Sequence, residues 1–113
     1  MNLLIVGSRS IKEFDLSEHI SSTPDLIISG GADGIDSIAE KYADDHRISK
    51  LILRPKYNTY GKYAPLKRNE KMVDLADEIL IIWNGESKGT KYTEQYAKKT
   101  NKSIRTIICK KNA

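Results

Sequence analysis

Residues 26–36 read Leu-Ile-Ile-Ser-Gly-Gly-Ala-Asp-Gly-Ile-Asp, an apolar run that ends abruptly in a glycine-rich turn. The run Leu26–Ile28 is short and lacks polar alternation, which is typical of a strand buried on both faces of a parallel sheet. Gly30 and Gly31 permit a tight turn directly after it. Residues 34–47 then carry apolar side chains at helical spacing. This stretch therefore predicts a strand, a tight turn and a helix.

The same alternation extends along the chain in both directions. Because parallel sheets are built from alternating strands and helices with right-handed crossovers, the pattern predicts an α/β fold. We expect a doubly wound sheet of about five mainly parallel strands in the order 3-2-1-4-5, flanked by helices. The further predicted strands are Leu3–Val6, Leu51–Leu53, Ile79–Trp83 and Ile104–Cys109, and the further predicted helices are 65–76, 90–100 and, on a weaker pattern, 11–21.

Length and composition exclude several classes of protein. With 113 residues the chain is expected to form one domain, 1–113. Its single cysteine, Cys109, excludes an internal disulfide framework and a cysteine-based zinc cluster. His19 and His46 have no partners at ligand spacing, so we expect no metal site. The apolar runs are too short to cross a bilayer and the N-terminus does not resemble a signal peptide, so we expect a cytoplasmic protein with no membrane partner.

Charge is distributed unevenly along the chain. Residues 1–50 hold five basic and nine acidic side chains, whereas residues 51–113 hold fourteen basic and six acidic ones. The first part therefore carries a formal charge of −4 and the second +8, which add to the total of +4. Such asymmetry makes an anionic ligand or a nucleic acid a partner worth testing, although solvated surface lysines are the plainer explanation.

A binding site is expected at one edge of the sheet, because ligands of open α/β sheets bind beyond the carboxyl ends of the strands. Five of the seven glycines follow predicted strands at that edge. The helix after Gly34 would aim its amides and positive end at the crevice, which favours phosphate. The candidate ligand-binding residues there are Gly7, Ser8, Arg9, Ser29, Gly30, Gly31, Asp33, Gly34, Asp36, Arg68, Asn69, Trp83, Ser87, Gly89 and Thr90.

Several of these residues have an equally plain structural explanation. Asp33 suits a helix N-cap as well as a ligand hydroxyl, whereas Asp36 fits ribose hydroxyls better. Arg9 and Arg68 suit bidentate bonds to phosphate, but Arg68 also fits a surface helix position. Trp83 would stack on a base or pack at the rim of the core. The glycine spacing matches neither the dinucleotide fingerprint nor the P-loop, and no Ser-His-Asp arrangement is present, which disfavours an NAD oxidoreductase, an NTPase and a serine hydrolase.

Taken together, the motifs resemble the SLOG superfamily of Rossmann-like proteins, which includes the LOG phosphoribohydrolases and the DprA proteins. The chain looks most like the small single-domain branch related to YspA and YpsA. The likeness runs over nearly the whole chain, with the segments in the expected order. The segments that carry it are Gly7-Ser8-Arg9, Ser29–Asp36, Arg68-Asn69 with Met72-Val73, and Ser87-Lys88-Gly89-Thr90.

The resemblance implies a site for a nucleotide or a nucleotide-derived small molecule. A nucleoside monophosphate, an ADP-ribose-like molecule and a cyclic nucleotide signal all fit this description. The two glycine loops would hold phosphate and ribose, with Arg68 and Asn69 facing the ligand. The implied role is that of a sensor or a sequestering module, with no separate cofactor and with a dimer or higher homo-oligomer as an open possibility.

Two alternatives follow from other members of the superfamily. The first is hydrolysis of a nucleotide N-glycosidic bond, with Glu94 as the candidate catalytic residue, or an aspartate in its place. LOG-type enzymes carry a glutamate three residues after the threonine of Gly-Thr, where this chain has Thr93, and a shift of one residue turns a helical side chain by about 100°. The second is DprA-like binding of single-stranded nucleic acid, the least favoured partner, which requires a basic stripe with exposed aromatics such as Tyr57, Tyr60 or Tyr63.

Overall fold

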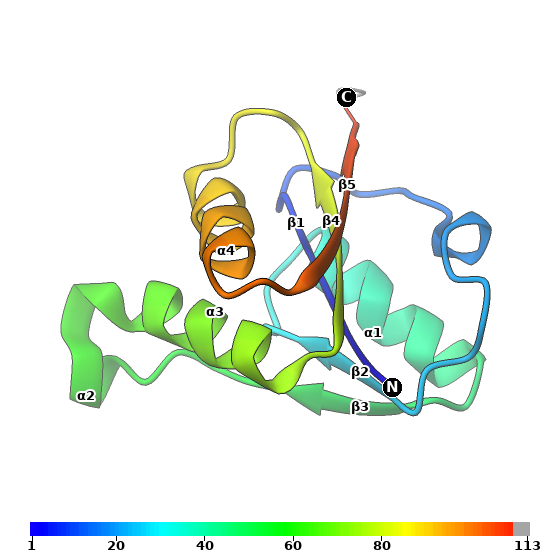
Figure 1. Cartoon of the computed structure of the whole chain (residues 1–113), viewed down its shortest axis with the longest axis horizontal. Helices are drawn as coiled ribbons and strands as arrows, with labels where there is room; N and C mark the ends of the chain where they lie inside the picture. The colour runs from blue at the N-terminus through cyan, green and yellow to red at the C-terminus, as the bar shows by residue number, and fades with distance from the viewer. Residues whose placement is uncertain (110–113) are drawn as a thin grey trace.

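The computed structural model describes residues 1–109 and shows an α/β fold built on a five-stranded sheet (Figure 1). Every strand pair is parallel and the order is β3-β2-β1-β4-β5, which confirms the predicted doubly wound arrangement. Each of the five predicted runs forms a strand. Their bounds are β1 (Asn2–Gly7), β2 (Leu26–Ser29), β3 (Ser49–Ile52), β4 (Glu78–Trp83) and β5 (Ser103–Ile108).

Helices cover both faces of this sheet. Helix α1 (Ile35–Asp45) lies on one face, and α3 (Ala64–Leu75) and α4 (Lys88–Lys99) lie on the other (Figure 1). Each face has its own core cluster. Leu3 and Ile5 of β1 pack on the α1 side, whereas Leu4 and Val6 pack toward α3 and α4. The central strand thus alternates between two apolar layers, which explains its continuous apolar sequence.

Two predictions about elements are wrong in part. Residues 11–21, which the weak pattern predicted as a helix, contain only the short 3-10 turn η1 (Leu16–Glu18). The rest of the segment is a loop, and its apolar residues Ile11 and Leu16 pack into the core. The run in β3 is not buried on both faces, since β3 is an edge strand and Ser49–Leu51 are exposed. Two further short elements that the sequence pattern did not predict, α2 (Tyr57–Tyr60) and η2 (Gly61–Tyr63), lead into α3.

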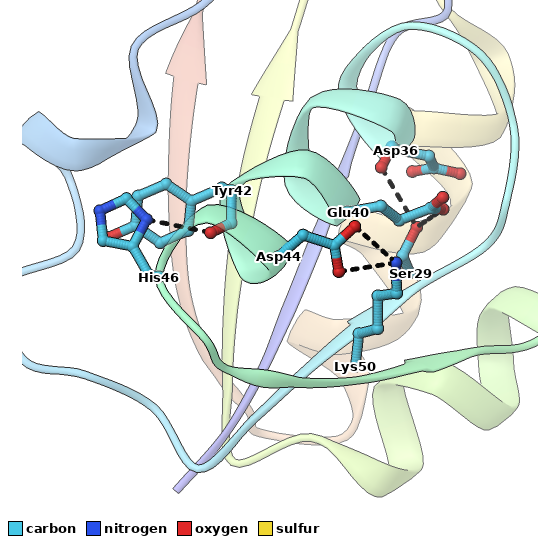
Figure 2. Close-up of polar contacts among 7 residues, drawn as sticks. All are labelled: Ser29, Asp36, Glu40, Tyr42, Asp44, His46 and Lys50. Carbon is cyan, nitrogen blue, oxygen red and sulfur yellow. Dashed lines mark hydrogen bonds and ion pairs between the residues drawn. The ribbon is translucent and has the colours of Figure 1, made fainter.

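Polar contacts fix α1 against the strands beside it (Figure 2). The Ser29 hydroxyl at the end of β2 donates to a carboxylate oxygen of Glu40 at 2.7 Å. On β3, the Lys50 ammonium pairs with the Asp44 carboxylate at 2.9 Å. These contacts hold the first helix, and with it the turn after β2, in a defined position. No helix in residues 1–109 is long and apolar enough to cross a membrane.

Candidate functional site

A cavity of about 390 Å³ opens beyond the carboxyl ends of β1 and β4. β1 and β4 are neighbours in the sheet, and the chain continues from them in opposite directions. After β1 it leads to β2 on one side, and after β4 it leads to β5 on the other side. Doubly wound sheets bind their ligands at such a topological switch point. The cavity is lined by Val6, Gly7, Ser8, Arg9, Ser10, Ala32, Asp36, Pro65, Leu66, Arg68, Asn69, Met72, Asn84, Ser87, Gly89, Thr90 and Thr93.

Hydrogen bonds join the loops that follow β1 and β4 into one rim. The buried Ser8 hydroxyl accepts from the Asn84 main-chain amide at 3.0 Å. The Asn84 side-chain amide donates to the Ser10 hydroxyl, also at 3.0 Å. The side-chain oxygen Oδ1 of Asn84 accepts from the main-chain amides of Glu86 and Ser87 at 2.8 and 2.9 Å. Asn84 therefore sets the shape of the turn that enters α4.

The N-terminus of α4 forms one side of the cavity. The helix begins after Ser87, and the Ser87 and Thr90 hydroxyls lie 3.1 Å apart. The first amides of a helix have no intrahelical acceptor, and the helix dipole adds positive potential at the same end. Gly89 and Thr90 of this first turn both line the cavity. An anionic group bound here would meet main-chain donors and a favourable field.

The turn before α1 brings a carboxylate to the opposite side. Gly34 begins the helix with φ of +73°, and a Cβ added to it would lie 2.5 Å from the carbonyl oxygens of Ser8 and Arg9. The N-cap is thus glycine, and the interpretation of Asp33 as a side-chain cap is wrong: Asp33 is exposed, and no side chain caps this helix. Instead Asp36, in the first turn, accepts from the Ala32 amide at 3.1 Å.

Asp36 is the buried ionisable group of the cavity. Its burial raises the pKa of the carboxyl above the usual value, while the Ala32 amide and the nearby Arg68 guanidinium act in the opposite direction. A carboxylate at this position repels phosphate and accepts hydrogen bonds from hydroxyl groups. The Asp36 side of the cavity therefore suits a polyol such as ribose.

Arg68 lines the cavity but most of its donors are already used. Its Nη1 donates to the carbonyl oxygens of Gly30 at 2.6 Å and Leu53 at 3.1 Å, and its Nε donates to the Asn69 side chain at 2.7 Å. Burial lowers the pKa of the guanidinium and Asp36 partly offsets this effect. Arg68 thus ties three segments together. The exposed Arg9 is the cation at the mouth.

The structure brings some of the candidate residues together and leaves others outside. Among the described residues, nine candidates line the cavity: Gly7, Ser8, Arg9, Asp36, Arg68, Asn69, Ser87, Gly89 and Thr90. Six candidates do not: Ser29, Gly30, Gly31, Asp33, Gly34 and Trp83. Trp83 packs at the rim of a core cluster, and its indole donates to the Ser87 carbonyl at 3.0 Å.

Glu94, the candidate catalytic residue, lies away from the cavity. Its carboxylate accepts from the Thr106 hydroxyl of β5 at 2.7 Å. The preceding residue, Thr93, lines the cavity and donates to the Gly89 carbonyl at 3.0 Å. Thr93 and Glu94 therefore face different sides of α4, as expected for neighbouring residues that are rotated by about 100° around the helix axis.

Sequence reasoning missed the apolar wall of the cavity. Pro65, Leu66 and Met72 of α3 form it together with Val6. The sequence carried no signal for this, because the side chains of α3 reach the switch point only through packing of α3 on the sheet. Asn84 had a weak signal, since it directly follows a predicted strand. Within residues 1–109, no three His, Cys, Asp or Glu side chains are grouped to hold a metal ion.

The chain is similar in sequence to a bacteriophage protein. No protein-family model matches the chain, and no solved structure matches it significantly. The chain is 31% identical over 110 residues to the Gene 61 protein of Mycobacterium phage D29, an alignment that covers 86% of this chain and 88% of the phage protein. At this identity and coverage, the chain belongs to the same family as that phage protein.

Proposed function

We propose that this chain is a SLOG-type domain that binds a nucleotide or a nucleotide-derived small molecule in the cavity beyond β1 and β4. A nucleoside monophosphate, an ADP-ribose-like molecule and a cyclic nucleotide are the candidate ligands. The observation that carries the proposal is that one cavity at the switch point combines a helix N-terminus, a buried carboxylate and an apolar wall. Its volume of about 390 Å³ lies within the range of about 300–1,000 Å³ typical of small-molecule sites.

Each part of a nucleotide has a matching wall. A phosphate fits against the first turn of α4 at Gly89 and Thr90, with Arg9 as its counterion. The ribose hydroxyls fit the buried Asp36. The base fits the apolar wall of α3, where Leu66 and Met72 contribute aliphatic surface. The cavity lining contains no aromatic side chain among the described residues, so the base is held by packing and not by stacking.

Binding without turnover is the function that this geometry supports best. N-glycosidic hydrolysis needs a carboxylate that stabilises a developing positive charge on the sugar, as in glycoside cleavage. Glu94 contacts Thr106 and does not line the cavity, so the buried Asp36 is the carboxylate of the lining. We therefore propose the role of a sensor or sequestering module, with hydrolysis through Asp36 as the alternative. A cytoplasmic location stays a prediction.

Thermal-shift measurements with AMP, ADP-ribose and cyclic AMP test the proposal. A ligand present at about 100 times its Kd stabilises the protein by about 2.7 kcal/mol, which raises the melting temperature of a domain of this size by about 10 °C. Arg9→Gln should abolish or strongly reduce the shift, because the exposed Arg9 lines the cavity mouth. Arg105→Gln on the exposed side of β5 is the matched control and should retain it. Absence of a shift with all three ligands would contradict the proposal.

A further inference from the structure

Opposite charges gather at the two ends of the molecule. Figure 1 is drawn with the longest axis horizontal, and it shows α2 at one end and the blue loop around η1 at the other. A groove of about 570 Å³ lies between α2 and the outer side of α3. Residues 11–20, which surround η1, form an acidic loop. Because groove and loop lie at opposite ends, one chain cannot bring its own loop to its own groove.

The groove is basic. Five cationic side chains and two carboxylates line it, which leaves a formal excess of +3. Two of the cations, Lys56 and Lys71, are exposed, and neither takes part in an ion pair within residues 1–109. The two carboxylates are engaged by α4, since Glu70 and Asp74 each accept from a tyrosine hydroxyl of that helix. The groove therefore offers unpaired positive charge to a partner.

The acidic loop offers the complementary charge. It holds three carboxylates, Glu13, Asp15 and Glu18, against one cation, Lys12, so that its formal charge is −2. All three carboxylate residues are exposed, and none of them forms an ion pair in the part of the chain that the structure describes. Asp15 accepts from a main-chain amide of η1 at 3.0 Å. Glu13 and Glu18 are thus the carboxylates best placed to meet a partner.

Both ends also expose apolar surface. At the groove, Tyr60 is 45% exposed and Leu75 is 41% exposed. In the acidic loop, Phe14 is only partly buried and stacks on the His19 ring, with 5.3 Å between the ring centroids. Protein interfaces combine an apolar centre with a polar and charged rim. Each end has both components, and the charges of the two ends are opposite.

We propose that these two ends bind each other between copies of this chain, with the acidic loop of one copy docked on the basic groove of the next. Opposite charges then meet across the contact and steer the association. A two-fold symmetric dimer through either end would place like charges together, which is unfavourable. The contact is therefore head-to-tail. Since its two halves lie at opposite ends of the molecule, further copies add in a row.

Neither half of this contact uses the nucleotide cavity, because Glu13, Glu18, Lys56 and Lys71 all lie outside its lining. The copies should associate without any added nucleotide, so the outcome does not depend on what the cavity binds. Sedimentation velocity at several protein concentrations measures the association. At about 10 mM salt the average mass should rise with concentration. At about 1 M salt it should return to that of a monomer, because the Debye length falls from about 30 Å to about 3 Å.

Two variants separate the halves of the contact. Lys56→Gln/Lys71→Gln weakens the groove, and Glu13→Gln/Glu18→Gln weakens the loop. Each variant alone should sediment as a monomer at about 10 mM salt, because every contact needs one intact loop and one intact groove. An equimolar mixture should form a 1:1 dimer and no longer species. In that dimer the intact loop of the first variant meets the intact groove of the second, and the ends that remain are the altered ones.

Matched controls remove the same charges from exposed positions elsewhere. Lys91→Gln/Lys99→Gln lies on α4, and Asp33→Asn/Glu86→Gln lies in turns outside the loop and the groove. Both should associate like the parent, and thermal melts confirm that all four variants are folded. Four results would overturn the proposal: a parent that stays monomeric at low salt, a dimer that does not lengthen with concentration, an equal loss in the controls, or a mixture that stays monomeric.

Discussion

The guanidinium of Arg68 donates to the main-chain carbonyl of Gly30 at 2.6 Å, across 38 residues of sequence. The same nitrogen reaches the Leu53 carbonyl, so that one side chain of α3 holds the turn after β2 and the segment after β3. A Cβ on Gly30 would lie 2.7 Å from this nitrogen, which shows how closely the arginine passes over the glycine. One wall of the cavity thus depends on the contacts of a single side chain.

Arg68→Lys should therefore destabilise the protein although it keeps the charge. A lysine ammonium lacks the planar fork and cannot reproduce the bonds to two carbonyls and to Asn69. Because the side chain is only partly buried, we expect a loss of about 1–2 kcal/mol in the free energy of unfolding, measured with urea. Arg105→Lys, at an exposed position of β5, is the control and should change it by less than about 0.5 kcal/mol. Equal values for the two variants would mean that the bonds of Arg68 contribute nothing to stability.

Gly34→Ala should destabilise the protein more than Gly61→Ala. The two glycines have nearly the same backbone angles, φ of +73° with ψ of −127° and φ of +58° with ψ of −133°. Both substitutions incur the strain of this conformation, about 1–3 kcal/mol. Only at Gly34 would the new Cβ also meet main-chain oxygens at 2.5 Å, since nothing lies within 4 Å at Gly61. Urea unfolding measures the difference. Equal losses in the free energy of unfolding would show that the loop after β1 moves away from the new Cβ without destabilising the protein.

Asp36→Asn should stabilise the protein at neutral pH. Burial raises the pKa of Asp36 in the folded state above the usual value of 3.8, so ionisation of this carboxyl works against folding. Its stabilising neutral form is fully present below pH 3.8 and is lost as the pH rises through the folded pKa. Asparagine stays neutral and can still accept from the Ala32 amide.

The stability gained in Asp36→Asn should consequently grow as the pH rises from about 4 to 7, which urea unfolding at several pH values measures. Ligand-induced stabilisation should fall in the same variant, because the amide is a weaker acceptor for ribose hydroxyls. The exposed Asp33→Asn is the control for the effect of surface charge. A gain that does not change with pH would contradict the assignment of Asp36 as a carboxyl with a raised pKa.

Tyr92→Phe should destabilise the protein at neutral pH and leave it unaffected in strong base. The Tyr92 hydroxyl donates to Glu70 and joins α4 to α3, and this bond raises the pKa of the phenol above its usual value of 10.0. The stability it contributes is fully present below pH 10 and is lost as the pH rises through the folded pKa. Melting temperatures of the parent and the variant should therefore converge at high pH. Tyr63→Phe, with an exposed ring in η2, is the control; a difference that persists unchanged would contradict a role for this bond.

The location of the candidate site could be predicted from local sequence patterns, but the roles of several residues could not. Glycines after strand ends marked the correct edge of the sheet, and Gly7 and Gly89 do line the cavity. Asp33 and Asp36 are three residues apart and both were candidate ligand-binding residues, yet Asp36 is buried and Asp33 is exposed. Which of the two faces the cavity depends on Gly34, whose backbone angles set the direction in which α1 begins.

The type and order of the strands followed from the sequence alone, because burial of a parallel sheet on both faces requires continuous apolar runs and right-handed crossovers leave few possible orders. The tertiary structure decided what the polar residues do. A guanidinium can reach a phosphate or a main-chain carbonyl equally well, and only the packing of α3 against the sheet brings Arg68 to Gly30. The same packing places Met72 in the cavity and leaves Lys71 exposed outside it, because neighbouring residues of a helix face different sides.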